Sequence, residues 1–149
     1  MFTVTNTGNR NVVIQEIDVV NRRNANTLIT IYSQEGSLSE LGDYALNDYA
    51  WGEPIYQSVK SGQPMKLLEL DDFNAEITVV PGASVSFYVH SASGLMYAKM
   101  DGTSDPDEIG EQQQGDGHIT ISEGRVMRGL FRNHIGPGKW GGSIKYYIE

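Results

Sequence analysis

The chain has 149 residues, enough for one domain that buries about two-thirds of the surface its unfolded form exposes. Its formal net charge of -8 disfavours nucleic acids and anionic membranes as partners, because these require a face with an excess of Lys and Arg. Without cysteine it has neither disulfides nor thiolate metal sites, and no segment is apolar over the length of a bilayer. We therefore expect a single domain over residues 1–149 that does not insert into membranes.

Apolar and polar residues alternate along most of the chain, and clusters of Gly, Asn, Asp and Pro interrupt them as turns interrupt short strands. This pattern predicts strands at residues 2–5, 12–20, 28–33, 51–59, 65–70, 75–80, 84–90, 95–100, 118–122, 126–131 and 143–148. Two packed sheets accommodate these strands better than one flat sheet, since each sheet then buries the apolar face of the other. We predict an all-β fold, an antiparallel two-sheet β-sandwich of jelly-roll-like type with about ten strands.

Three connecting segments interrupt this alternation. Pro81 and Gly82 separate two alternating runs and predict either a β-hairpin or a corner. Residues 37–49 have a weak helical pattern that Gly42 interrupts, so a long loop with one helical turn is an equal alternative. Residues 101–117, here called the acidic loop, are rich in Asp, Gly and Gln, and we expect them to form one long surface loop.

Several segments occur along the chain in the order ITIYSQEGS, AWGEPIY, ITVVPGASVSFYV, LMYAKMDGTS, ITISEG and KWGGSIKYYI. In this order they resemble a module found, often in tandem, in secreted proteins of diatoms and other stramenopile algae and in some bacteria. The resemblance implies a β-sandwich in an extracellular or cell-surface protein, and it brings no catalytic residues. The chain departs from the module where Trp140, Gly141 and Gly142 replace Trp-Asn-Gly, and it stands alone rather than in tandem.

The acidic loop is the candidate metal site. Asp101, Asp105, Asp107 and Asp116 lie in it with no Lys or Arg among them, and carboxylate oxygens are the ligands that Ca²⁺ prefers. An EF-hand is excluded because Pro106 stands where that turn needs Gly. Two interpretations stay open, a loose calcium site and a plain solvated loop, and we expect no other cofactor.

Four aromatic residues are candidates for ligand binding: Tyr49, Trp51, Tyr56 and Trp140. Flat rings that are exposed on a sheet or loop stack on the apolar faces of sugars. Trp51 and Trp140 flank predicted strands, however, where a large ring more often fills the core. We expect Tyr49 to be the exposed ring of this set.

The sequence gives little indication of catalysis. His90, His118 and His134 are far apart and lack zinc-binding spacing, and no serine lies in a Gly-x-Ser-x-Gly turn. Glu16 and Asp18 share a strand face and are either a carboxylate pair of glycosidase type or, as we expect, part of a solvated face.

The C-terminal region has the opposite charge to the acidic loop. Residues 124–148 include five cations and no acidic residue, namely Arg125, Arg128, Arg132, Lys139 and Lys145. We expect these cations to neutralise the acidic loop within one molecule. The alternative is that they bind the acidic loop of a neighbouring copy and so form a homo-oligomer.

Together these features predict a non-enzymatic recognition module that binds a glycan or a protein ligand through loops around residues 49–56 and 101–116. The first alternative is a structural subunit whose sandwiches assemble into a shell, filament or coat. A glycosidase-type or calcium-dependent enzyme is the third interpretation.

Overall fold

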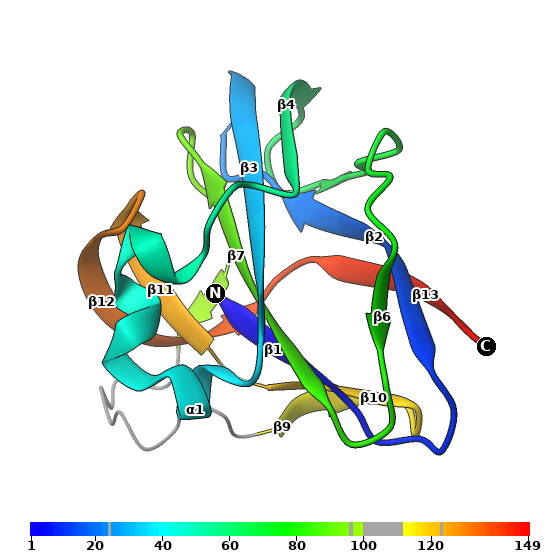
Figure 1. The fold of residues 1–149 in the computed structure, drawn as a ribbon. Coiled ribbons are helices and arrows are strands. Elements are labelled where there is room, and N and C mark those ends of the chain that lie inside the picture. Colours follow the sequence, from blue (N-terminus) through cyan, green and yellow to red (C-terminus); the bar gives the residue numbers. More distant parts are fainter. Residues whose placement is uncertain (24, 96, 100–111, 123) are drawn as a thin grey trace.

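The computed structural model describes residues 1–23, 25–95, 97–99, 112–122 and 124–149, and it confirms an all-β fold of packed antiparallel sheets (Figure 1). The strands are β1 (Phe2–Asn6), β2 (Val12–Val20), β3 (Ala25–Glu35), β4 (Tyr56–Gly62), β5 (Leu67–Leu68), β6 (Ile77–Val79), β7 (Ser84–Ser91), β8 (Tyr97–Lys99), β9 (Gln112–Gly115), β10 (Ile119–Ser122), β11 (Gly124–Gly129), β12 (Arg132–Trp140) and β13 (Ser143–Ile148). Between β3 and β4 lie the helical turn α1 (Leu38–Leu41) and the 3₁₀ turns η1 (Gly42–Leu46) and η2 (Asp48–Ala50). No helix in this described part is long and apolar enough to cross a membrane.

The described strands pair into three groups. The largest sheet has the order β4-β3-β7-β1-β10-β9. A second group has the order β13-β2-β5, with β6 also paired to β2, and the third has the order β11-β12-β8. In Figure 1, β11 and β12 lie on one side of β1 and β7, and β2 and β13 lie on the other.

The main core lies between the largest sheet and the β2 sheet because alternate residues of the facing strands are apolar. Phe2 and Val4 of β1, and Val85, Phe87 and Val89 of β7, are all buried in it. A bulge in β2 between its pairings with Lys145 and Tyr146 changes the alternation, so that apolar residues before and after it reach the same core. Burial of these side chains is the main source of stability for the fold.

A second apolar cluster covers the opposite face of the largest sheet. Its buried members are Tyr32, Leu38, Ala45, Ala50, Trp51 and Tyr88. The segment α1–η2 supplies three of them, and residues 37–49 form a series of short helical turns rather than a long loop with a single one. The predicted strand at residues 51–59 begins only at Tyr56, because Trp51 turns back and its Nε1 donates to the carbonyl oxygen of Ala45 at 2.8 Å.

The bounds of several other predicted strands were wrong. The strand expected at residues 65–70 is only Leu67–Leu68, and β9 lies within the expected acidic loop. Strand β12 was not predicted because its Gly and Pro residues resemble a turn, yet it pairs with both β11 and β8.

Of the two alternatives for Pro81 and Gly82, the structure shows the corner. Strand β6 pairs with β2, whereas β7 pairs with β1 and β3.

Gly142 occupies a point of close approach between the end of β12 and β2. A Cβ atom at this position would lie 2.0 Å from the carbonyl oxygen of Asp18 and 2.3 Å from the ring of Trp140. That ring stacks on Phe2 with centroids 4.4 Å apart, so it cannot move without disturbing the core. The third residue of the Trp-Gly-Gly segment is therefore required to be glycine.

We expect Gly142→Ala to lower the free energy of unfolding by about 3 kcal/mol, because overpacking displaces the backbone or the Trp140 ring. Urea denaturation followed by tryptophan fluorescence measures this loss. Gly129→Ala is the matched control, since the nearest atom to a Cβ there is 3.9 Å away. Equal losses in the two variants would show that close packing at Gly142 is not the cause.

Candidate functional site

The structure separates the four aromatic candidates. Trp51 is 3% exposed, and Tyr56 is 7% exposed with its hydroxyl donating to Asp72 at 2.7 Å. These two rings are packed inside the protein, which corrects the hypothesis that they bind a ligand. Tyr49 is 67% exposed, as expected, and its ring meets the edge of the Tyr44 ring at a centroid distance of 5.3 Å. A ligand role for Tyr49 stays a prediction.

Of the candidate calcium ligands, Asp101, Asp105 and Asp107 lie outside the described residues. Asp116 closes the turn between β9 and β10, where its carboxylate accepts hydrogen bonds from the backbone N–H groups of His118 and Ile119 and from the Tyr146 hydroxyl. Burial alone would raise the pKa of Asp116, but these hydrogen bonds outweigh it and lower that pKa. Nowhere in the described ranges do three or more His, Asp or Glu residues form a group that could hold a metal ion.

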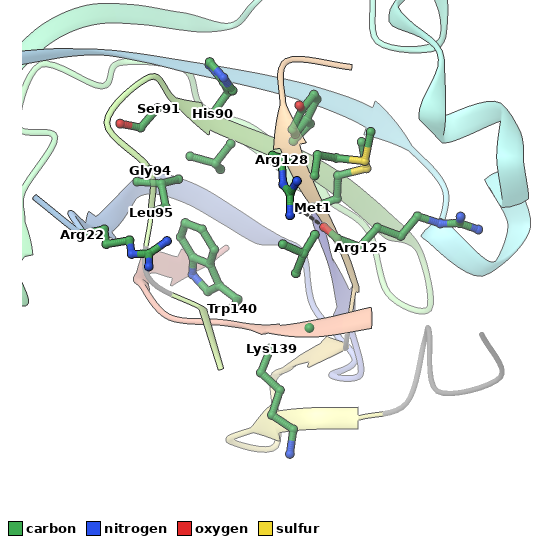
Figure 2. A pocket seen from close by; sticks show the side chains of 15 residues that line it. Met1, Arg22, His90, Ser91, Gly94, Leu95, Arg125, Arg128, Lys139 and Trp140 are labelled. Carbon is green, nitrogen blue, oxygen red and sulfur yellow. Dashed lines mark hydrogen bonds between the residues drawn. The ribbon is translucent and has the colours of Figure 1, made fainter. Parts of the chain in front are cut away.

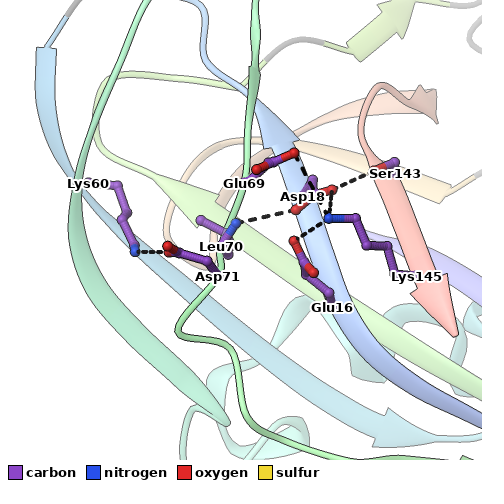
Figure 3. A network of polar contacts seen from close by, with 8 residues as sticks. All are labelled: Glu16, Asp18, Lys60, Glu69, Leu70, Asp71, Ser143 and Lys145. Carbon is purple, nitrogen blue, oxygen red and sulfur yellow. Dashed lines mark hydrogen bonds and ion pairs between the residues drawn. The ribbon is translucent and has the colours of Figure 1, made fainter.

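The carboxylates of Glu16 and Asp18 belong to a structural network (Figure 3). Asp18 is fully buried and accepts hydrogen bonds from the Leu70 N–H at 3.3 Å and the Ser143 hydroxyl at 2.7 Å. Lys145 lies 2.8 Å from Glu16 and 3.8 Å from Asp18. The expectation of a solvated face was therefore wrong for Asp18, since both of its carboxylate oxygens accept hydrogen bonds from protein groups.

A second network joins β4 to the segment before β6. Lys60 lies 2.7 Å from Asp72 and 3.0 Å from Asp71, and Figure 3 shows its contact with Asp71. Hydrogen bonds from Lys60 and then from Tyr56 lower the pKa of Asp72 to about 2. Both carboxylate networks thus hold neighbouring strands together.

Two adjoining cavities lie between the end of β7 and the hairpin formed by β11 and β12. The first has a volume of about 410 Å³ and is shown in Figure 2, and the second has a volume of about 590 Å³. They share five lining residues, namely Arg22, His90, Ser91, Gly94 and Arg128. No sequence motif connects these residues, which come from three separate parts of the chain.

Specific hydrogen bonds hold the walls of the cavities in place. The backbone N–H of Arg22 donates to the carbonyl oxygen of Gly94 at 3.1 Å, which fixes the segment after β2 against the turn after β7. The Tyr88 hydroxyl donates to the carbonyl oxygen of Gly129 at 3.1 Å and accepts from the N–H of Phe131 at 3.0 Å. Tyr88 therefore attaches the tip of the β11–β12 hairpin to β7, the strand that carries His90.

Positive charge dominates both linings. The charged lining residues are Arg22, Arg23, Arg125, Arg128, Arg132 and Lys139, and none of the described lining residues is acidic. Arg125 forms an ion pair with Asp43 at 3.3 Å. For the other four arginines, the described chain offers no carboxylate within ion-pair distance. Most of the acidic loop, which we expected the C-terminal cations to neutralise, lies outside the described residues.

The cavities are also lined by groups that carry no charge. Burial lowers the pKa of His90, so its imidazole is neutral at pH 7 and adds hydrogen bonding rather than charge. Trp140 lines the first cavity, and Figure 2 shows Arg22 extending toward its ring. In the same view Arg125 and Lys139 extend away from Arg22, which leaves Arg22 and Arg128 as the central cations. Trp140 is the one aromatic candidate from the sequence that lines these cavities.

The sequence matches no protein-family model, and no curated protein or solved structure is significantly similar to it. The geometry and charge of the cavities therefore carry the functional argument.

The Asp72 network makes stability depend on pH in a defined direction. Because the pKa of Asp72 in the folded protein, about 2, lies below its ordinary value of 3.8, its stabilising contribution is present above about pH 4 and is lost as the pH falls toward 2. The contribution is at most about 1 kcal/mol, since the Asp72 side chain is 49% exposed. Asp72→Asn should therefore be less stable than the wild type at pH 7 and equally stable near pH 2, as measured by urea unfolding at each pH.

Asp71→Asn is the control for this experiment, because Asp71 binds the same lysine but its side chain is 82% exposed. It should show a smaller difference at pH 7. A deficit of Asp72→Asn that stays constant from pH 7 to pH 2 would contradict the assignment of the low pKa to Asp72.

Proposed function

We propose that the protein is a non-enzymatic binding module whose ligand is an anion held in the two adjoining cavities. The observation that carries this proposal is the set of arginines in the linings that have no carboxylate partner in the described chain, although the net charge of the whole chain is -8. A guanidinium group presents planar paired donors that fit the oxygens of carboxylate, sulfate or phosphate. Several such groups around one hollow form a site that selects anions.

The side chains around His90 support binding rather than catalysis. The Ser91 hydroxyl interacts with the hydroxyls of Thr27 at 3.0 Å and Ser93 at 3.1 Å instead of with the imidazole. None of the described lining residues supplies a carboxylate to orient His90. A nucleophile activated by a base needs both of these contacts, so the described lining lacks the arrangement that covalent catalysis uses.

The charges of the cavities act on a bound anion mainly at short range. At physiological ionic strength, charges separated by more than about 8 Å are largely screened, so distant carboxylates repel a bound anion only weakly. Arg22 and Arg128 lie in the cavities themselves and act at hydrogen-bonding distance on any ligand there. The site therefore binds an anion after close approach and does not attract it over a long distance.

Self-assembly through opposite charges has weaker support. Two of the C-terminal cations are used within the molecule, since Arg125 pairs with Asp43 and Lys145 pairs with Glu16. This leaves fewer cations for the acidic loop of another copy. The structural-subunit alternative therefore ranks below ligand binding.

Binding of pyranine, a small trisulfonated dye, tests the proposed function by fluorescence anisotropy. The wild type should bind it saturably at low salt, and the double variant Arg22→Ala/Arg128→Ala should bind at least about tenfold more weakly, because each charge-assisted pair contributes about 1.5–3 kcal/mol. Rising salt should weaken binding in the wild type more than in the variant.

The control is Arg10→Ala/Lys66→Ala, which removes the same charge at exposed residues that line neither cavity. Thermal melts establish that all three proteins fold. The proposal is wrong if the wild type does not bind the dye, or if the two double variants lose affinity equally.

A further inference from the structure

We infer that the ligand is a linear acidic polysaccharide whose consecutive carboxylate or sulfate groups lie through both cavities. This inference rests on the proposed function and specifies its ligand. Three features of the linings carry it: the adjacency of the two cavities, the spread of their cations, and the neutral groups that also line them.

The two cavities lie side by side and are here together called the groove. Arg22, Gly94 and Arg128 are among the residues that line both. Their volumes are about 410 and 590 Å³, and each lies in the range of about 300–1,000 Å³ that holds a drug-sized molecule. A single carboxylate or sulfate ion would fill only a small part of this groove.

The cations are distributed along the groove instead of converging on one point. Arg22 and Arg128 line both cavities, whereas Arg23 and Arg132 line the second cavity alone. One small anion contacts one or two guanidinium groups and leaves the others without a partner. A chain with repeated negative groups satisfies them all, and each further contact is made at a high effective concentration.

The neutral lining groups suit a sugar backbone. Trp140 lines the first cavity, and an aromatic ring packs well against the apolar C–H face of a sugar. Ser93 lines the second cavity, and its hydroxyl, which bonds to Ser91 at 3.1 Å, has capacity for a further hydrogen bond to a sugar hydroxyl. Single-stranded nucleic acid requires rings for successive bases, but the Tyr88 ring is packed against Phe131 at a centroid distance of 4.9 Å. Sugar is therefore the better fit.

Titration calorimetry with oligogalacturonates of increasing length tests the inference. Affinity should rise at least about tenfold from the monomer to the hexamer and then level off when the groove is filled. The double variant Arg23→Ala/Arg132→Ala should lose most of this gain with length, because it lacks the two cations that line the second cavity alone. The control Arg10→Ala/Lys66→Ala should keep the full gain.

Parallel titrations identify the ligand class. A heparin-derived hexasaccharide that binds more tightly than the galacturonate hexamer would identify sulfate as the anionic group, and weaker binding would identify carboxylate; either result supports the inference. Equal affinity for a fully methyl-esterified hexamer, or tighter binding of single-stranded DNA of equal charge, would overturn it. Pyranine binding without any dependence on oligosaccharide length would overturn the inference but leave the proposed function standing, whereas loss of all binding would remove both.

Discussion

The hydrogen bonds of the Tyr88 hydroxyl are the constraint on which the candidate site depends. They attach the tip of the β11–β12 hairpin to β7 and so help to set the separation between the two walls of the groove. The ring of Tyr88 is 2% exposed and packs against Phe131 and Trp51. Burial raises the pKa of Tyr88 to about 12, so the phenol stays protonated and continues to donate to the Gly129 carbonyl throughout the physiological range. A side chain of the second apolar cluster thus positions the binding surface.

Strand β7 serves the fold and the site through the same alternation. Val85, Phe87 and Val89 point into the main core, whereas Tyr88 and His90 point to the opposite face. Side chains of a strand alternate between its two sides, so one strand contributes both to the main core and to the lining of the groove. The cations that line the groove lie after β2 and along the β11–β12 hairpin rather than in the main core, which separates binding from stability. This separation makes charge-removing substitutions informative about binding alone.

The parts of the fold that depend on local alternation were predictable, and those that depend on long-range contacts were not. Strands β2 and β13 matched their predicted bounds because each is a run rich in Val, Ile or Tyr that begins directly after an Asn or Gly residue. Strand β12 was not predicted, because its Gly and Pro residues resemble turns in a sequence, and Gly136 has a φ of 141° beside the irregularity in the pairing with β11. The exposure of Tyr49 was predicted, but the placement of Arg22 and Arg128 in the lining of the same cavities was not. It requires the bridge between Asn21 and Leu95 and the Tyr88 attachment, neither of which leaves a local pattern.

The net charge of the whole chain does not describe the groove, because its cations have different roles in different parts of the structure. Lys60 and Lys145 neutralise carboxylates that connect strands, so these cations stabilise the fold and are absent from the groove. Apart from Arg125, the arginines of the groove have no such partners among the described residues. Exposed carboxylates elsewhere repel anions, which makes the groove a favourable region for a negatively charged ligand on an otherwise acidic protein. A ligand with a single negative charge makes few favourable contacts in the groove, and the carboxylates elsewhere on the protein repel it. A chain of negative charges makes a favourable contact with each arginine that it reaches. The separation of charges on this surface therefore favours an extended anion.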